Sequence, residues 1–188
     1  MASLPITLQT RTQICRNAVF TVYFDHIRDA AGNEIRDYLS VVPHHRAAHK
    51  VSGIAVLPVA ADGFGLIRVY RYPLGEYSWE VARGFVDSAE TPAQAALREL
   101  REETGLVAAE GSLRSFGAIA PEPGVLDARV QLFVAEGCQR GHGASVLEMG
   151  HRELRFFARG ELCGLIDRSE ILDPCTLVLC LKYLSLPA

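Results

Sequence analysis

The segment from Gly84 to Leu106 constrains this chain most, because it crowds three carboxylates onto one side of a short predicted helix. These are Glu99, Glu102 and Glu103, and like charges at such spacing repel each other. The last two stand in the final helical turn, where the helix macrodipole favours cations. A bound divalent cation is the simplest way to make this arrangement favourable. Oxygen-only ligands indicate Mg²⁺ or Mn²⁺.

The helix has clear start and stop signals. Thr91 can cap its N-terminus, Pro92 suits the first helical position, and Gln94 completes a capping box with Thr91. Gly105 supplies the left-handed stop. At about 100° per residue, one stripe docks the helix on a core while the adjacent acidic arc borders a cleft. The predicted docking stripe consists of Ala93, Ala96, Leu97, Leu100 and Thr104.

The charge pattern alone leaves a second interpretation open. Arg98 and Glu102 are spaced i, i+4, and such ion pairs are common on solvated helices, where they stabilise little. The full spacing decides between the two interpretations only through the resemblance described next, because a chance match to all of its fixed positions has odds on the order of one in 10⁸ at average residue frequencies. The fixed positions are Gly84, Glu90, Arg98, Glu99, Leu100, Glu102, Glu103, Gly105 and Leu106.

These positions match the box that defines the Nudix hydrolases, and the chain resembles that superfamily. The resemblance implies an α/β fold, the Nudix α/β/α sandwich around a mixed sheet. It also implies divalent-metal-dependent hydrolysis of a nucleoside diphosphate linked to another moiety. The metal ligands would be Glu99 and Glu103, Glu102 directly or through water, and the backbone carbonyl of Arg83. Glu102 and Glu103 would thereby belong to the catalytic centre.

The remaining box positions have structural roles in this resemblance. Gly84 and Gly105 shape the backbone at the two ends of the box. Glu90 and Arg98 form a buried pair that holds the box loop against the helix. An exposed salt bridge between them, which would contribute little, is the alternative interpretation.

Within the superfamily, the pattern is similar to the ADP-ribose and nucleotide-sugar pyrophosphatase branch. The similarity rests on an N-terminal hairpin, on the stretch 69–72 that contains Arg71, on Glu80 in the stretch 80–84, and on Pro121 beyond the box. It implies that Arg71, Trp79, Glu80 and Pro121 bind the substrate. Arg71 would place its planar guanidinium on a phosphate or simply extend from a strand end. Trp79 would stack a base or fill the core.

The chain also departs from that branch at several positions. Tyr70 replaces the usual glutamine, and Ala82 and Arg83 replace a proline and an alanine. Asp127 stands one position before the acidic residue that usually ends the loop after Pro121. A metal bond through the Arg83 backbone carbonyl does not depend on the side chain at this position. Recognition of the sugar does depend on side chains, so these changes affect it.

The general base in this branch is commonly a glutamate on a mobile loop well after the box. The glycine-rich stretch 137–150 is the natural candidate, and Glu148 within it is the predicted base. The alternative interpretation is that Glu148 is an ordinary loop residue without a catalytic role. His151, close in sequence, is an alternative base.

Composition sets the protein class. With 188 residues, 49% hydrophobic and 22% charged, the chain can bury one sizeable core. With a net charge of −3, no basic patch suggests nucleic-acid binding. The five cysteines show no CxxC spacing, which favours thiols of a reducing compartment over disulfides or a zinc site. No signal peptide opens the chain and no apolar run approaches the length of a membrane span, so we expect a cytoplasmic protein without membrane contact.

The chain divides into two parts of one domain. Residues 1–48 are an N-terminal arm (1–17) and a β-hairpin with strands at 18–25 and 35–42, and residues 49–188 are the hydrolase core. In the branch the hairpin exchanges between subunits, which implies a homodimer. Expected core strands lie at 51–59, 65–72, 78–81, 112–119, 129–136 and 153–157, and expected helices after the box at 159–166 and 174–185.

The resemblance predicts a small-molecule nucleotide as substrate, namely ADP-ribose or a related nucleotide sugar, cleaved to AMP and a sugar phosphate. Hydrolysis of dinucleoside polyphosphates or of oxidised nucleoside triphosphates is the alternative within the enzyme class. A metabolite-sensing Nudix domain that does not cleave its ligand is the alternative from another class. The intact box favours the enzyme.

Overall fold

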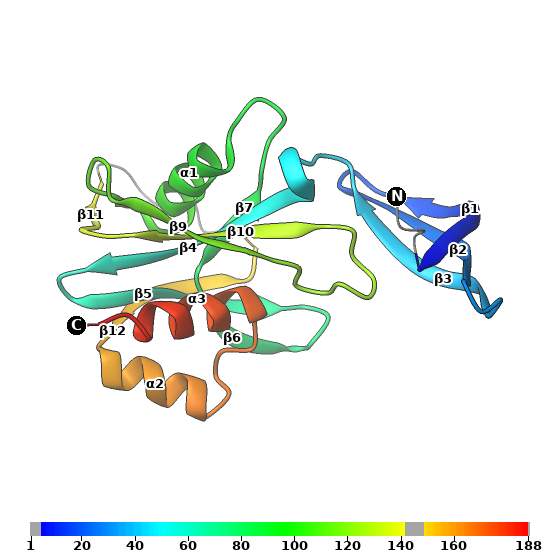
Figure 1. Ribbon diagram of the computed structural model, residues 1–188. Coiled ribbons are helices and arrows are strands. Elements are labelled where there is room, and N and C mark those ends of the chain that lie inside the picture. Colours follow the sequence, from blue (N-terminus) through cyan, green and yellow to red (C-terminus); the bar gives the residue numbers. More distant parts are fainter. Residues whose placement is uncertain (1–4, 142–148, 188) are drawn as a thin grey trace.

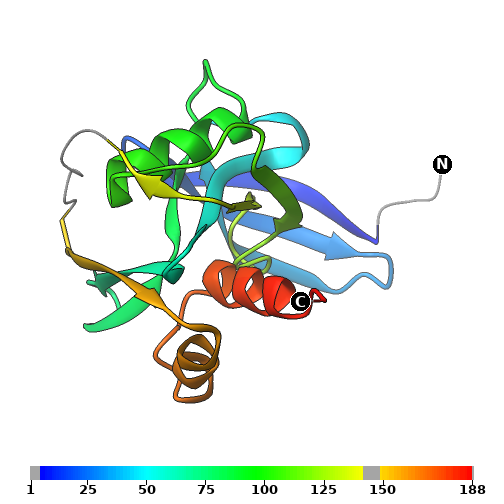
Figure 2. The ribbon, with the colours of Figure 1, turned by 90° about the vertical axis from the view of Figure 1, so that its left-hand side faces the viewer.

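A mixed β-sheet lies between helices on its two faces in the computed structural model, which describes residues 5–141 and 149–187 (Figure 1). Helix α1 (Pro92–Thr104) covers one face, and helices α2 (Arg159–Asp167) and α3 (Pro174–Leu184) cover the other. Figure 2 shows α1 and α3 on opposite sides of the strands. This arrangement is the α/β/α sandwich that the sequence predicts.

The strands of the core sheet run in the order β12-β5-β4-β10-β9, with β6 beside β5 and β7 beside β4. Strands β4 and β10 are parallel, and the other pairs are antiparallel. Short β8 (Leu106–Val107) pairs with β11 (Gln139–Arg140) separately. The sheet strands are β4 (Val51–Ala60), β5 (Gly63–Arg71), β6 (Glu76–Glu80), β7 (Ala82–Phe85), β9 (Leu113–Ile119), β10 (Arg129–Ala135) and β12 (His151–Phe157).

Strand β4 explains how the core is divided between the two faces. Its side chains alternate, so that Ile54 and Val56 pack toward α1 while Ala55 and Leu57 pack toward α2 and α3. All four are almost fully buried. A strand covered on both faces reads as a continuous apolar run, which is why this segment was predictable.

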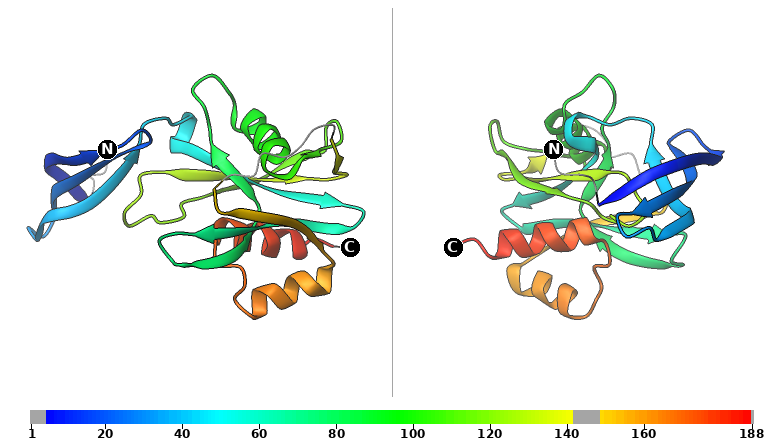
Figure 3. Two further views of the ribbon diagram at one scale, coloured as in Figure 1. Left: turned by 180° about the vertical axis from the view of Figure 1, so that it is seen from behind. Right: turned by 45° about the vertical axis from the view of Figure 1, so that its right-hand side comes forward.

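The N-terminal strands form a separate antiparallel sheet that stands beside the core (Figure 3). Its order is β1 (Ile6–Arg16), β2 (Phe20–Asp29), β3 (Glu34–Pro43). The hairpin of β2 and β3 was predicted. The prediction of an arm or tail over residues 1–17 is wrong for 6–16, which is a strand paired along β2. Every residue of β1 is exposed, so its sequence carries no buried alternation that would reveal it.

Polar and backbone contacts join the N-terminal sheet to the loop of residues 121–128. The Val41 amide donates to the Val125 carbonyl at 2.8 Å, and the Asp127 amide donates to the Val41 carbonyl at 2.9 Å. The Asp127 carboxylate accepts from Arg46 at 2.7 Å and also pairs with Lys50. These contacts attach the free edge of β3 to one wall of the cavity described below.

Helix α1 has the predicted ends but a different buried face. Thr91 and Gln94 form the capping box, and Gly105 is left-handed with φ 69°. The predicted docking stripe is wrong in part, since Ala93 and Leu97 are exposed. The buried residues are Ala95, Ala96, Glu99, Leu100, Glu103 and Thr104. The helix is thus rotated so that part of its acidic arc faces the sheet, which places carboxylates in the interior.

The cysteines are all thiols, as the sequence predicts. Cys138, Cys175 and Cys180 are buried, while Cys15 and Cys163 are exposed. Burial raises the pKa of Cys138 to about 11 and those of Cys175 and Cys180 to about 12, so these three thiols stay protonated and packed. Among the described residues, every helix is too short or too polar to cross a bilayer.

Candidate active site

A cavity of about 530 Å³ opens where helix α1 meets strands β4 and β7. Strands β2, β5 and β12 and the loop of residues 121–128 also contribute to its wall. The cavity gathers residues that lie far apart in the chain, from Phe20 to His151. Two of the three predicted acidic ligands, Glu99 and Glu103, are at its surface. Its volume is in the range of sites for small molecules.

Glu99 lies directly against the backbone of Gly84. A Cβ at residue 84 would stand 1.9 Å from Glu99 Oε1, a distance that real atoms do not tolerate. The glycine therefore leaves the space in which the Glu99 carboxylate lies against the strand, and a larger residue would displace that carboxylate. Glu99 is only 7% exposed, and its Oε1 accepts from Arg98 Nη1 at 2.7 Å.

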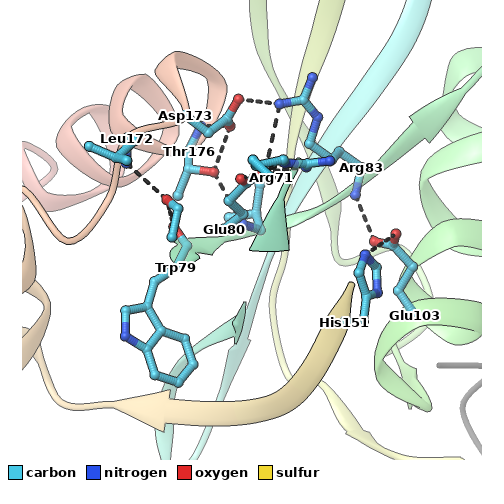
Figure 4. A network of polar contacts seen from close by, with 11 residues as sticks. Arg71, Trp79, Glu80, Arg83, Glu103, His151, Leu172, Asp173 and Thr176 are labelled. Carbon is cyan, nitrogen blue, oxygen red and sulfur yellow. Dashed lines mark hydrogen bonds and ion pairs between the residues drawn. The ribbon is translucent and has the colours of Figure 1, made fainter. Parts of the chain in front are cut away.

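Glu103 is held from two sides. Its Oε2 accepts from the backbone N–H of Arg83 at 2.9 Å, and its Oε1 lies 3.6 Å from His151 Nε2 (Figure 4). Glu103 is 5% exposed, and the His151 side chain is similarly buried. Strands β7 and β12 therefore converge on this carboxylate, although they are remote in sequence.

Arg98 connects the acidic residues of the box. Its Nη2 donates to Glu90 at 2.7 Å and to the Phe85 carbonyl at 3.0 Å, while its Nη1 reaches Glu99 and, at 3.2 Å, Glu102. The hydrogen bond from Arg98 lowers the pKa of Glu90, and the Glu90 bond in turn raises the pKa of Arg98. The geometry agrees with the predicted structural pair, which here fixes residues 85–90 against α1.

Glu102 differs from the other two acids. Its side chain is 45% exposed, it points to Arg98, and it is not part of the cavity wall. Within residues 5–141 and 149–187, no three His, Cys, Asp or Glu side chains converge to hold a metal ion by themselves. The three carboxylates predicted from the box therefore do not meet at one point in the described residues, since Glu102 is on the exposed side of the helix and reaches Glu99 only through Arg98.

The donor set nevertheless fits a hard divalent cation. Glu99 and Glu103 are carboxylates on the same helix, both at the cavity and both beside the backbone of residues 83 and 84. Gly84 leaves open the space that a Cβ would fill. Such all-oxygen surroundings, completed by a backbone carbonyl and water, are what Mg²⁺ and Mn²⁺ prefer.

The predicted substrate-binding residues separate into two groups. Arg71 and Pro121 are at the cavity wall. Glu80 is 2% exposed and lies behind Arg71, whose Nε donates to Glu80 Oε1 at 2.8 Å and whose Nη2 contacts Oε2. Glu80 is not at the cavity wall, so the prediction of a direct substrate contact is corrected to that of a partner that orients Arg71.

The Trp79 prediction is also corrected. Trp79 is 5% exposed and packs edge-on against Phe157, with ring centroids 4.8 Å apart, in the core on the α2 and α3 side. Figure 4 shows its ring pointing away from Glu103 and His151. Successive side chains of a strand face opposite sides, so Trp79 and its neighbour Glu80 do not share an environment. Trp79 therefore fills the core and does not stack a ligand.

Asp173 is a partner of the cavity residue Arg83 that the sequence did not reveal. The Arg83 guanidinium forms a hydrogen-bonded ion pair with it and lies 3.8 Å from Glu80 Oε2. Arg83 and Asp173 are 90 positions apart, so no local sequence pattern links them. The signal was the arginine at position 83, a charged residue where the branch has a small one.

The predicted general base, Glu148, lies outside the described residues. His151, the alternative, lies at the cavity and near Glu103. The base therefore remains a prediction for either residue.

Comparisons with known proteins give the family. The family model described as NUDIX domain matches residues 49–174, and the chain belongs to this family. An ADP-ribose pyrophosphatase of Bacillus subtilis is 31% identical over 137 residues, which cover 72% of this chain and 69% of that protein. An uncharacterised Nudix hydrolase of Schizosaccharomyces pombe is 33% identical over 87 residues. That match spans 46% of this chain and only 42% of the yeast protein's length.

The fold agrees with a solved structure described as an ADP compounds hydrolase. The TM-score is 0.79, and the match covers 97% of this chain and 94% of the other at 17% sequence identity. At that identity the likeness establishes the architecture, including the place of the N-terminal sheet beside the core. The chain is thus a Nudix protein with an intact box.

Proposed function

We propose that this protein is a divalent-metal-dependent pyrophosphohydrolase that cleaves a nucleoside diphosphate derivative, with ADP-ribose or a related nucleotide sugar as substrate. The observation that carries the proposal is the pair of buried carboxylates, Glu99 and Glu103, beside the Gly84 backbone at one cavity. The names of the similar Bacillus subtilis protein and of the similar solved structure support the substrate class.

The residues present suit a diphosphate, whose phosphoric anhydride bond is the one to be cleaved. Glu99, Glu103 and the Arg83 carbonyl would hold Mg²⁺ or Mn²⁺, which offsets the charge of the diphosphate and orients the attacking water when bound. Arg71 presents a guanidinium to the same cavity, already oriented by Glu80. Phosphoryl transfer depends on positioning and electrostatics, and these fixed charges supply both. Glu102 would contribute through water from the outer side of the helix.

The two candidate bases would act on the attacking water. A base must reach the water within hydrogen-bond distance and accept its proton. Glu148 is the candidate from the glycine-rich stretch, and His151 is the candidate already at the cavity. Comparing the pH–rate profiles of Glu148→Gln and His151→Gln distinguishes the two, because only loss of the base removes the acidic limb of the profile.

The N-terminal sheet supports the proposal of a homodimer. Six large hydrophobic side chains of β1, β2 and β3 are between 40% and 53% exposed. They are Ile6, Leu8, Ile14, Phe24, Ile35 and Leu39. A soluble domain seldom exposes so many together, and a second copy of the sheet would cover them. Under this proposal residues 1–48 are the dimer element and 49–188 the hydrolase core. We place the protein in the cytoplasm.

A substrate panel tests the function. The protein would be incubated with ADP-ribose, other nucleotide sugars, dinucleoside polyphosphates and nucleoside triphosphates, with Mg²⁺, Mn²⁺ or a chelator. We expect AMP and ribose 5-phosphate from ADP-ribose, and no product with the chelator. Faster cleavage of dinucleoside polyphosphates or triphosphates would contradict the substrate class. Binding of ADP-ribose without cleavage would instead support a sensor.

A further inference from the structure

Arg83 connects two distant parts of the molecule through its side chain. The residue is in β7, and its guanidinium reaches Asp173 at the start of α3 (Figure 4). Asp173 is 7% exposed and is therefore a nearly buried partner. Such a charge-assisted bond is stronger than a neutral one and is directional.

Asp173 is itself firmly held. It caps helix α3, with Oδ2 accepting from the Thr176 amide at 2.8 Å and from the Thr176 hydroxyl at 2.7 Å. The same hydroxyl oxygen accepts from the Val81 amide at 3.1 Å. Hydrogen bonds therefore link the Val81 amide to the Thr176 hydroxyl, that hydroxyl to the Asp173 carboxylate, and the carboxylate to the Arg83 guanidinium. With the backbone from 81 to 83 they form a closed ring. This ring fixes the backbone between strands β6 and β7 to the start of α3.

The backbone of Arg83 belongs to the proposed metal site. Its N–H donates to Glu103, its carbonyl is a proposed ligand, and the next residue is the glycine that touches Glu99. The branch pattern has a proline at position 82, whose ring restricts the backbone just before this carbonyl. This chain has Ala82 there and gains the tether from Arg83 to Asp173.

We propose that Asp173 is a positioning residue of the metal site, acting through Arg83 to fix the backbone beside Glu99 and Glu103. The proposal rests on the metal-dependent function proposed above. Partners that orient metal ligands commonly contribute tenfold or more to metal affinity. Here the tether takes the place of the missing proline.

Simple charge effects predict a different result, which makes the proposal testable. If Arg83 acted only as a nearby positive charge, its removal would reduce repulsion and tighten binding of a cation. If Arg83 acts as a tether, its removal weakens binding, because the backbone loses its anchor. Asp173→Asn keeps an oxygen for the helix cap, where asparagine is as effective as aspartate, and loses the charge and the acceptor oxygen that hold Arg83.

The experiment measures Mn²⁺ binding without nucleotide, by the electron paramagnetic resonance signal of the free ion. Arg83→Ala and Asp173→Asn should each weaken binding about tenfold, and the double variant should weaken it no further. Asp25→Asn is the matched control, since Asp25 is also a 5% exposed side chain bonded to an arginine, Arg11, but in the N-terminal sheet. It should bind Mn²⁺ like the wild type.

Several outcomes would overturn the proposal. Unchanged or tighter Mn²⁺ binding by Arg83→Ala is one, and equal weakening by the control variant is another. A higher KM for ADP-ribose with unchanged Mn²⁺ binding would make Arg83 a substrate contact instead. If Asp173→Asn does not fold, Arg83→Ala alone decides, because that side chain is 32% exposed. Wild-type protein that binds Mn²⁺ but cleaves no diphosphate would refute the function and leave the binding comparison valid, whereas no Mn²⁺ binding would refute both.

Discussion

The box region and the N-terminal sheet place their side chains in opposite ways. In the box region, carboxylates are buried, with Glu99 and Glu103 at 7% and 5% exposure. In the N-terminal sheet, large apolar side chains such as Leu8 and Phe24 are exposed. Buried charge and clustered exposed hydrophobics are the informative exceptions to normal burial. These two placements carry the two proposals made above, a cation at the box region and a second copy of the chain at the N-terminal sheet.

The strongest test of this contrast is at the buried carboxylates. Glu103→Gln keeps the shape and the bond from Arg83 but removes the charge, so turnover of ADP-ribose should fall by at least ~100-fold through lost metal-assisted charge stabilisation. Circular dichroism should show an unchanged fold. The control is Glu110→Gln, an exposed carboxylate that should leave turnover unchanged. Near-normal turnover by the Glu103 variant would remove Glu103 from the site.

The next test is at the exposed apolar side chains. Leu8→Asp should raise the dissociation constant of the dimer roughly 30-fold, since the dimer loses two leucines that are already about half buried in each subunit and contribute about 1 kcal/mol each. Sedimentation velocity over a dilution series measures this. Leu181→Asp is the matched control, because Leu181 on α3 is 52% exposed and Leu8 is 53% exposed. A wild-type protein that is monomeric at every concentration would contradict the comparison itself.

A third test adds a single methyl group between strand and helix. Gly84→Ala forces Glu99 away from the strand, so Mg²⁺ or Mn²⁺ affinity should fall about tenfold. Isothermal titration calorimetry without nucleotide measures it. Gly160→Ala serves as control, since a Cβ there meets open space. Equal affinity in both variants would mean that the closeness of Glu99 to Gly84 does not matter for the ion.

The smallest expected effect concerns the pair of Glu90 and Arg98. The hydrogen bond from Arg98 lowers the pKa of Glu90 from its ordinary value of 4.5. The ionised Glu90 therefore stabilises the fold at pH values above 4.5. This contribution is lost as the pH falls through the lower pKa of the folded state. Glu90→Gln should lower Tm by about 2–4 °C at neutral pH, and the difference from wild type should shrink in acid.

The control for this pair is Glu170→Gln. Glu170 pairs with Arg168 at the surface, at 44% exposure, and such pairs contribute little. A Tm difference for Glu90→Gln that stays constant between neutral and acidic pH would show that the pair does not act through its charge.

The sequence was informative where local physics decides the outcome. Capping residues set the ends of α1, and apolar runs located the core strands and both later helices. Local rules could not give the rotation of α1. Its apolar residues alone predict that Leu97 is buried, but the helix faces the sheet with Ala95, Glu99 and Glu103, and Leu97 is exposed. Tertiary packing here overrides the helical pattern.

The position of the box carboxylates was more predictable than their surroundings, while their role as metal ligands stays a prediction. The spacing of the box placed Glu99 and Glu103 correctly at one cavity. It could not show that Glu102 pairs with Arg98 away from the cavity wall. It also could not show that Trp79 faces the core, because adjacent side chains of a strand point to opposite faces and the spacing does not tell which face is which. The bond from Arg83 to Asp173 depends on the fold as a whole.

The backbone bonds at the edge of β3 limit where the hairpin of β2 and β3 can accept inserted or deleted residues. Because Val41 exchanges backbone bonds with the 121–128 loop, an inserted or deleted residue between Ile35 and Val41 would turn every following side chain to the other face and shift the loop's anchor. At the hairpin tip a Cβ on Gly32 would meet open space, and among the described residues the hydrogen bonds of the tip stay within the turn of residues 29–33. Natural variation in length and grafted peptides should therefore be accepted at the tip and rejected along the strand.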